Sequence, residues 1–542
     1  MIQPEPVRTH IELDAAPSSW AASAPPADQP YGGGLLEQVL TGWAANAPGG
    51  RSSDKVGGES ADRGGPTQLE QFLEAESAAE KLRLWLGDDF LRREAGERWG
   101  DVAGRLQGAV AAIDAKLCRQ LERILHHPNF QRLEATWRGV EHLTDCKDRA
   151  GDAPIRVRVL NASWAEVRRD FDRASEFDQS ELFRKIYEDE FGTPGGQPYG
   201  TILADFEVHP RPSPEHPHDD VSVLRSLAQV AAAAFCPVFL NASPTMFGVD
   251  RFDQMQQTVD YAKIQGDLDF LAWRQFRQSE DARFIGLVMP RMLMRQRYGR
   301  EQIARCGFNF EEYGGDRQGH LWGGAVYAVG ETLIRAFGQS RWLADIRGAQ
   351  RGVEGGGVVL GPTYAEFATD SPEVSFKVST ETIISDALEQ QLTELGFIPL
   401  CACKDAPFSA FYSCPSTQKP KGYNTPDATA NAKISAMLNY MLCVSRFSHY
   451  IKVICRDKVG GFRDAESLER ELHDWLMNYV VSNPDAGVSI KAGRPLRDAQ
   501  IRVLDDPGKP GSFRCVLQLS PHYELDDMQA SIRLVTELAP RG

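Results

Sequence analysis

Two adjacent histidines, His126 and His127, are residues of this 542-residue chain whose type suggests chemistry. Histidine binds metals and titrates near neutral pH. Neighbouring residues of a helix point about 100° apart, however, whereas metal-binding pairs on helices favour an i, i+4 spacing. Pro128 follows the pair, and proline ends one helix and suits the first position of the next. We therefore interpret the histidines as capping or hydrogen-bonding groups at a corner between two helices, with titration chemistry as the alternative.

The ten cysteines are scattered, several of them within apolar segments such as "AAFCPVFL". This placement is typical of reduced, buried thiols. The one close pair is Cys401 and Cys403, with Cys414 beyond it. A zinc site usually needs a second spaced pair, which is missing here. We expect no metal site and no cofactor.

Other motifs that bind phosphate or catalyse reactions are incomplete. The glycine-rich residues 352–362, "GVEGGGVVLGP", lack the Lys-Ser/Thr pair of a phosphate-binding loop, so we interpret them as a flexible surface loop. No G-x-S-x-G or H-E-x-x-H occurs, and the 11 histidines are dispersed. We expect no catalytic residues, although a triad assembled from distant residues stays open.

Residues 270–299 mix arginines with aromatic side chains, a combination that can bind single-stranded nucleic acid. The net charge of −15 disfavours a general nucleic-acid surface, and Glu280 and Asp281 interrupt the segment. We therefore expect salt bridges within or between subunits and no nucleic-acid partner. The arginines concerned are Arg274, Arg277, Arg283, Arg291, Arg295 and Arg297.

Hydrophobic runs are short throughout the sequence. None approaches the roughly 18 to 20 apolar residues of a membrane span. The first residues, "MIQPEPVRTHIELD", lack the basic and then apolar pattern of a signal peptide. We expect no direct membrane insertion and a cytoplasmic location.

Composition divides the chain into four segments. Residues 1–66 are rich in Pro, Gly and Ser and predict a largely disordered tail with one short helix, "LLEQVLTGW". Residues 67–150 predict a helical segment, and residues 151–428 predict an α/β region. Residues 429–542 predict helices followed by an antiparallel β-meander. The expected fold class is therefore a mixed α/β and α+β protein.

In the α/β region, strand candidates alternate with amphipathic helices, which predicts a covered, largely parallel or mixed sheet. The candidates are residues 155–160, 199–208, 236–241 and 284–289, and residues 320–337 predict a further buried helix. Apolar and polar residues alternate in the last strands of the chain. A terminal meander leaves backbone N–H and C=O groups along its edge, where a strand of another chain can bind.

The helical segment carries an apolar seam with steps of three and four residues, as narrow as that of a coiled coil. Two interpretations stay open, burial on the chain's own domain and contact with a partner helix. The seam comprises Val102, Leu106, Val110, Ile113, Leu117, Leu121 and Ile124. The next helix places Phe130, Leu133, Trp137, Val140 and Leu143 broadly on one side.

Nine stretches form an ordered set from about residue 68 to about residue 540. They are "ILHHPNFQRLEATWRG", "PYGTILADFEV", "FRQSEDARFIGLVMPR", "LWGGAVYA", "TETIISDALEQQLTELGFIPL", "QKPKGY", "DATANAKISAMLNYM", "SRFSHYIKVICRDKVG" and "PHYELDDMQASIRLV". The set resembles the large subunit of the bacterial type VI secretion contractile sheath, the TssC (VipB) family. The first 66 residues have no such match beyond the short "LLEQVL" helix.

The resemblance implies a phage-tail-sheath-like fold completed by a small sheath subunit, TssB (VipA). It implies heterodimers that polymerise with further copies into a helical sheath around a tube of Hcp hexamers. Such a sheath assembles on a baseplate, contracts to propel the tube and is recycled by a ClpV-type ATPase. Members of the family are not enzymes, which agrees with the incomplete motifs above.

On this resemblance we expect two kinds of contact between subunits. The small-subunit interface is expected at or near Leu106, Val110, Ile113, Leu117, Leu121, Ile124, Phe130 and Trp137. Strand exchange is expected in the final meander, with candidates Val516, Leu517, Ile532 and Leu534, and in an ordered N-terminal segment. Two alternatives stay open, a sheath subunit of another contractile injection system and an α/β enzyme.

Overall fold

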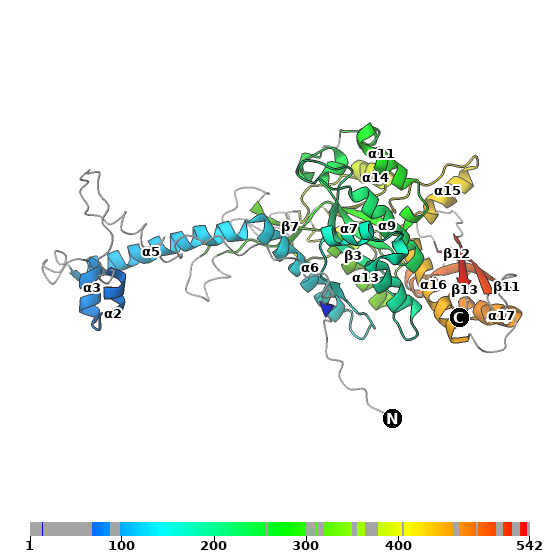
Figure 1. Ribbon diagram of the computed structural model, residues 1–542, viewed down its shortest axis with the longest axis horizontal. Coiled ribbons are helices and arrows are strands. Elements are labelled where there is room, and N and C mark those ends of the chain that lie inside the picture. The colour runs from blue at the N-terminus through cyan, green and yellow to red at the C-terminus, as the bar shows by residue number, and fades with distance from the viewer. Residues whose placement is uncertain are drawn as a thin grey trace, which may run out of the picture. The chain divides into compact units, whose positions relative to one another are not determined.

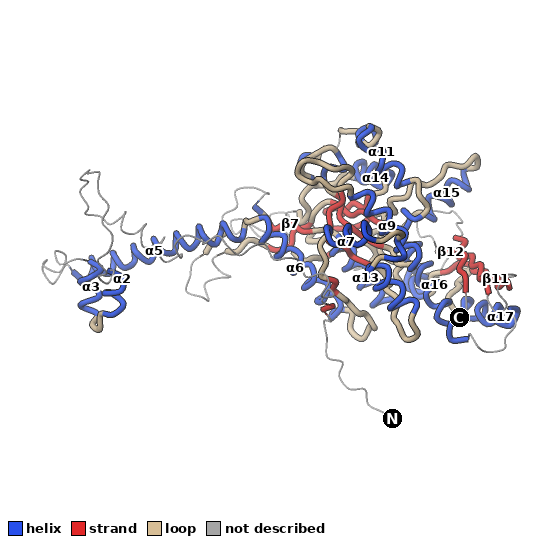
Figure 2. Tube along the Cα trace, in the orientation of Figure 1, coloured by secondary structure: helices blue, strands red, loops and turns tan. Residues whose placement is uncertain are grey.

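The computed structural model describes most of the chain from residue 98 onward and shorter pieces before it (Figures 1 and 2). The described residues are 13–14, 68–86, 98–255, 258–299, 310–312, 319–349, 355–363, 378–403, 406–458, 465–483, 486–505, 513–522 and 532–538. The helix expected in "LLEQVLTGW" lies outside them. The chain forms two compact units, Ala16–Leu117 and a larger one made of Met1–Ala15 with Cys118–Gly542.

The described residues of the smaller unit are helical. Helices α2 (Gln68–Glu74) and α3 (Ala78–Leu86) pack against each other. Helix α5 (Arg98–Leu125) begins in this unit and runs on for 28 residues in all. Its sequence contains no proline and is rich in Ala, Leu and Arg, which are strong helix formers. A single continuous helix therefore carries the whole seam predicted from the sequence.

A six-stranded sheet forms the centre of the larger unit, in the order β3-β4-β5-β9-β10-β8. The first four strands run parallel, and β10 is antiparallel to both of its neighbours. Every residue of β4 and β5 is buried, which is why they read as continuous apolar runs. The strands are β3 (Ile202–Val208), β4 (Val238–Ala242), β5 (Ile285–Met289), β8 (Val358–Val359), β9 (Phe397–Ala402) and β10 (Ser409–Phe411).

Helices cover this sheet and complete its core. Helix α9 (Asp220–Ala234) forms the crossover between β3 and β4, and α13 (Val326–Ser340) packs on β3, β4 and α6 (Pro128–Arg149). Further helices are α7 (Trp164–Arg173), α8 (Glu181–Phe183), α10 (Tyr261–Ile264), α11 (Leu271–Arg277) and α14 (Asp386–Glu394), with the π-helix η3 (Arg184–Gly192). Short 3-10 helices are η2 (Phe177–Gln179), η4 (Pro244–Phe247), η5 (Phe252–Gln254), η6 (Leu268–Phe270) and η7 (Asp281–Phe284).

Two predicted elements differ in the structure. The strand expected over 155–160 is reduced to β2 (Val159–Leu160), which pairs in parallel with β1 (Leu13–Asp14). The helix expected over 320–337 is divided into β7 (Leu321–Gly323), paired with β6 (Met292–Arg295), and α13. The division falls at Gly324, where an added Cβ would lie 2.2 Å from the Asn241 amide nitrogen. The close approach of another strand therefore overrides helix periodicity at this point.

The C-terminal part contains a second hydrophobic core, centred on Val444, Phe447, Leu472 and Leu519. Its antiparallel sheet has the order β11-β12-β13, as the alternation of apolar residues predicts. The elements are α15 (Pro426–Ser435), α16 (Leu438–Lys458), α17 (Ala465–Met477), α18 (Val488–Gly493), β11 (Leu496–Asp505), β12 (Phe513–Pro521) and β13 (Ile532–Leu538). The chain is thus a mixed α/β protein, as expected. None of its described helices combines the length and apolarity that crossing a membrane requires.

Candidate assembly surfaces

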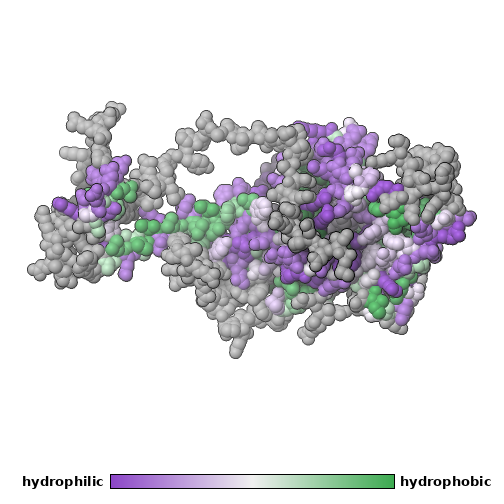
Figure 3. Space-filling view, turned by 90° about the horizontal axis from the view of Figure 1, so that it is seen from below, coloured by the Kyte–Doolittle hydropathy of each residue, from purple (hydrophilic) through white to green (hydrophobic). Residues whose placement is uncertain are grey.

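Helix α5 presents an apolar stripe to solvent. Leu106, Val110, Ile113, Leu117 and Ile124 are all exposed, Ile113 to 48%. Leu121 is half-buried. Figure 3 shows the stripe as a green band along the helix. Because a helix buried on its own domain would hide these side chains, their exposure favours contact with a partner helix.

Helix α6 has one face in the core and another in solvent. Its Gly139 lies where an added Cβ would meet the Tyr327 ring at 2.4 Å, so α6 and α13 approach closely. Leu143 is buried on the side of α6 that faces α13, although the sequence pattern placed it broadly on the same side as Trp137. The exposed residues of α6 are Phe130, Leu133 and Trp137, the last to 56%.

The two histidines lie at the corner between α5 and α6 and form hydrogen bonds there. The His127 Nδ1 accepts a hydrogen bond from the Asn129 N–H at 3.3 Å and so caps α6. The His126 Nε2 lies 3.0 Å from the Glu312 carboxylate. The interpretation of the pair as capping and hydrogen-bonding groups is confirmed.

Glu312 belongs to a buried network of charges that ties α6 to β6. Arg295 donates to the Glu312 carboxylate and to the Glu134 carboxylate, each at 2.6 Å. Burial tends to raise the pKa of Glu312, but the hydrogen bonds from Arg295 and from the Tyr298 N–H outweigh it and lower that pKa. The charges compensate one another, so the network acts as a structural joint.

The remaining arginines of 270–299 bond within the chain. Arg291 donates two hydrogen bonds to the Glu207 carboxylate at 2.6 and 3.0 Å, and Arg283 pairs with Glu280. The prediction of salt bridges is thus confirmed for Arg283, Arg291 and Arg295. Arg274 and Arg277 donate to backbone carbonyls within the chain, so for these two residues salt bridges between subunits stay a prediction. Arg297 contacts the His320 ring at 3.2 Å.

The other sequence candidates for chemistry form parts of the core. Cys401 and Cys414 are buried, and burial raises the pKa of each thiol to about 12. The described part of the glycine-rich segment is not a surface loop, because Val358 and Val359 form the buried strand β8. Gly357 is required there, since a Cβ would lie 2.0 Å from the Phe411 carbonyl oxygen.

Sequence reasoning missed a buried group between α6 and α13. The His142 Nε2 lies 2.8 Å from the Glu331 carboxylate and 3.7 Å from the Cys146 sulfur. Glu331 also accepts hydrogen bonds from the backbone N–H groups of Leu360 and Gly361. His142 and Cys146 have the i, i+4 spacing that could have drawn attention, but the glutamate is 189 residues further along the chain.

The protonation of His142 should make stability depend on pH. Burial alone lowers the pKa of His142, but the hydrogen bonds to Cys146 and Glu331 outweigh it and raise the pKa from 6.5 to about 9. Because the folded-state pKa is the higher one, this stabilisation is complete below about pH 6.5 and is lost as pH rises through about 9. We expect the free energy of unfolding to fall by about 3 kcal/mol over that range.

Denaturant unfolding of the full chain in complex with its assembly partner, at pH 6.5 and pH 9.5, would measure this effect. His142→Gln should be clearly less stable than the original chain at the lower pH and nearly equal to it at the higher pH. If the difference in unfolding free energy between the variant and the original chain were equal at both pH values, the assignment of the proton to His142 would be wrong.

The C-terminal sheet offers two strand edges, those of β11 and β13. Val516 and Leu517, expected as strand-exchange residues, lie in the middle strand β12 and pair on both sides within the chain. Ile532 and Leu534 lie in the edge strand β13. Among the described strands, β12 is therefore paired along both edges, whereas β13 is paired along one.

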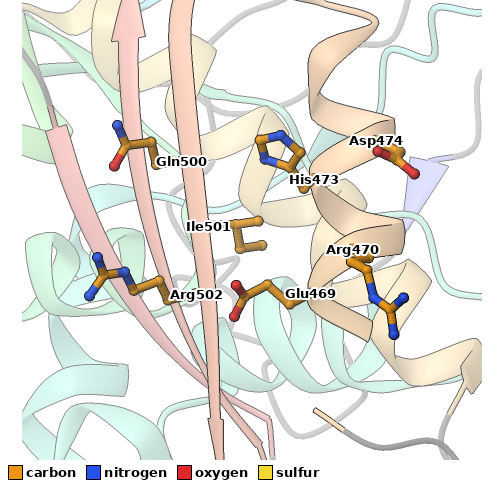
Figure 4. Close-up of a pocket in the computed structure, with 7 residues that line it drawn as sticks. All are labelled: Glu469, Arg470, His473, Asp474, Gln500, Ile501 and Arg502. Carbon is orange, nitrogen blue, oxygen red and sulfur yellow. The ribbon is translucent and has the colours of Figure 1, made fainter. Parts of the chain in front are cut away.

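The edge of β11 is occupied at two places. The Glu469 carboxylate accepts a hydrogen bond from the Val503 N–H at 2.8 Å, and Leu496 exchanges backbone hydrogen bonds with Tyr479 and Val481. Figure 4 shows Glu469 reaching from α17 toward β11. Between these two elements lies an open polar pocket lined by Glu469, Arg470, His473, Asp474, Gln500, Ile501 and Arg502. Its side chains carry charges of both signs, so the pocket has no single ligand chemistry.

Comparison with known proteins identifies the family of this chain. The family model of the EvpB/VC_A0108 (VipB) tail sheath N-terminal domain matches residues 107–418, and that of the gpW/gp25-like domain of the same tail sheath matches residues 427–538. The chain belongs to the VipB family of tail sheath proteins. Among curated relatives of the VipB chain, the type VI secretion system sheath protein TssC1 of Pseudomonas aeruginosa is 38% identical over 443 residues, which cover 81% of this chain and 86% of the relative.

A solved structure with a similar description also matches the VipB chain. It is the crystal structure of a sheath tail protein from Desulfitobacterium hafniense, with 11% identity and a TM-score of 0.29. The match covers 62% of this chain and 57% of the other.

The two VipB domain matches meet between residues 418 and 427, close to the predicted start of the C-terminal segment at 429.

Proposed function

We propose that this chain is the large structural subunit of a type VI secretion contractile sheath. The observation that carries the proposal is the match of both VipB domains in order along the chain, together with 38% identity to a type VI sheath protein over most of both lengths. The incomplete catalytic motifs support a structural role without bond-making chemistry. In this role the chain works in the cytoplasm and needs no cofactor.

The proposed partner on α5 and α6 is the small sheath subunit. The α5 stripe is exposed over Leu106 to Leu117, a length of three helical turns at 1.5 Å per residue. Its width suits one apolar helix, packed as in a coiled coil. Phe130 and Trp137 on α6 add exposed aromatic side chains, which are enriched where partners bind. These residues are therefore our candidates for the small-subunit interface.

The proposed site of strand addition is the outer edge of β13. The outer edge of β11 is blocked by Glu469 and by residues 479–481, whereas β12 is the one described strand that pairs with β13. Val503 directs its N–H away from β12, so the register assigns outward-facing backbone groups to Arg533, Val535 and Glu537. A strand from a neighbouring chain would hydrogen-bond to these three residues.

The N-terminal segment is the proposed source of an exchanged strand. Residues 13–14 already adopt extended backbone and pair with β2. Strand exchange links subunits through main-chain hydrogen bonds, which persist when whole domains rotate during contraction. Contacts with the Hcp tube, the baseplate and a ClpV-type ATPase follow from the same role. A sheath of another contractile injection system is the second candidate.

Co-expression with a small sheath subunit tests the proposal. We expect the two chains to copurify and to form long tubes with a cogwheel cross-section in negative-stain electron micrographs. Expression of the large chain alone should give aggregated or insoluble protein, because its apolar stripe and strand edge lack partners. A soluble monomer that forms no tubes with any sheath partner and turns over a small molecule would overturn the proposal.

A further inference from the structure

The loop that joins β3 to α9 is rich in histidine and proline, with the sequence "HPRPSPEHPHD" over residues 209–219. Both ends of the loop converge on Asp220, the first residue of α9. The His209 Nδ1 lies 3.1 Å from one carboxylate oxygen of Asp220, and the His216 Nε2 lies 2.9 Å from the other. The two imidazole rings are stacked, with their centroids 4.1 Å apart.

Asp220 is a fixed negative charge at this point. Its side chain is fully buried and also accepts hydrogen bonds from the Trp164 indole N–H at 2.7 Å and the His209 backbone N–H at 2.9 Å. Burial tends to raise the pKa of Asp220, but the hydrogen bonds from His209, His216 and Trp164 outweigh it and lower that pKa. The carboxylate is therefore ionised at neutral pH and faces two imidazole nitrogens.

We propose that His209, His216 and Asp220 form a binding site for a divalent transition-metal ion such as Zn²⁺. Ligand atoms bind zinc at about 2.0 to 2.2 Å, so two ligands of one tetrahedral ion lie about 3.3 Å apart. The observed nitrogen-to-oxygen distances of 3.1 and 2.9 Å need only small shifts to admit the ion. All three ligand atoms lie within 4.8 Å of one another.

The chemistry and the access of the site also fit such an ion. Two imidazoles and one carboxylate are ligands that zinc and related ions prefer over magnesium or calcium. Each histidine binds the metal as its neutral tautomer, with the proton on the ring nitrogen that faces away from Asp220. The side chains of His209 and His216 are 21% and 25% exposed, so an ion can enter and keep water as a further ligand. The bound ion would fix both ends of the loop to α9.

The other metal-type group among the described residues, His142 with Cys146 and Glu331, fits less well. All three side chains are buried, so an ion has no direct route to them. The Arg149 guanidinium lies 3.1 Å from the Cys146 sulfur, and this positive charge opposes a bound cation. We therefore assign that group to structure and the group around Asp220 to metal binding.

A zinc titration of the purified full-length chain, in its sheath complex and without a histidine tag, tests the proposal. After removal of metals with EDTA, competition with a chromogenic chelator measures Zn²⁺ affinity, and Co²⁺ absorption reports the ligand geometry. We expect one ion per chain. His209→Asn and His216→Gln keep an amide N–H to donate to Asp220, and each should weaken binding at least about 10-fold.

His473→Ala is the matched control, because His473 is an exposed histidine on α17 and should leave zinc affinity unchanged. Thermal unfolding shows whether each variant remains folded. Absence of bound zinc, or unchanged affinity in both folded loop variants, would overturn the metal site. Neither result would affect the sheath assignment, which depends on tube formation.

Discussion

Ile113→Asp should abolish copurification of this chain with the small sheath subunit. Ile113 lies in the middle of the exposed stripe of α5 and is 48% exposed. An aspartate there would place a charge inside an apolar helix-to-helix contact, at a cost of several kcal/mol if it stayed unpaired. The same side chain lies partly in solvent in the unpaired chain, so folding itself should change by less than about 1 kcal/mol. Pull-down from co-expressing cells, followed by electron microscopy for tubes, measures the result.

Ala112→Asp is the matched control for this experiment. Ala112 is the preceding residue of α5, is exposed, and lies well away from the stripe around the helix axis. The control adds the same charge to the same helix turn and should leave copurification and tube formation intact. If the folded Ile113→Asp variant still copurifies with the small subunit, the stripe is not part of the interface. Loss of pairing in both variants would point to damage of the helix itself.

The sequence predicted secondary structure and exposure best for residues whose environment is uniform along their element. Strands β4 and β5 are buried throughout, so their apolar runs identified them without knowledge of neighbours. The stripe of α5 was visible because its helix packs little along its length, and periodicity alone then sets which residues share a face. His127 was predicted as a cap because Pro128 fixes the start of α6 locally.

Long-range contacts account for what the sequence did not show. Gly324 ends β7 because Asn241 approaches from another strand, and no local signal predicts that approach. Glu331 meets His142 across 189 residues, and Trp164 reaches Asp220 from a separate helix. Side chains of this kind have ordinary neighbours in the sequence, so only the fold reveals them.

The backbone register of strand β13 identifies which of its residues could bind an added strand. The sequence predicted strand exchange in the final meander without saying which residues have free backbone groups. The Glu469 carboxylate settles this, because its hydrogen bond to Val503 defines which residues of β11 face outward. Counting through the two registers then gives Val535 as the central outward-facing residue of β13.

Val535→Pro should therefore block sheath assembly while leaving the chain folded. Proline has no N–H to donate and its ring hinders an approaching strand, so the added strand loses at least one hydrogen bond, worth about 1 kcal/mol, and its close fit. Pairing within the chain uses the backbone groups of Leu534 and Thr536 instead, so β12 keeps its partner. Because every subunit in the sheath repeats the lost contact, we expect tubes to disappear or to shorten at least about 10-fold.

Val535→Ala isolates the backbone effect, because alanine shortens the side chain but keeps the N–H. It should form tubes of normal length, and both variants should copurify with the small subunit, whose proposed contact lies on α5 and α6. Tube length in electron micrographs and thermal unfolding of the complex are the two measurements. Normal tubes with Val535→Pro would exclude this edge as the site of strand addition. Equal loss with Val535→Ala would assign the effect to the side chain, and strand addition through the backbone of β13 would then be wrong.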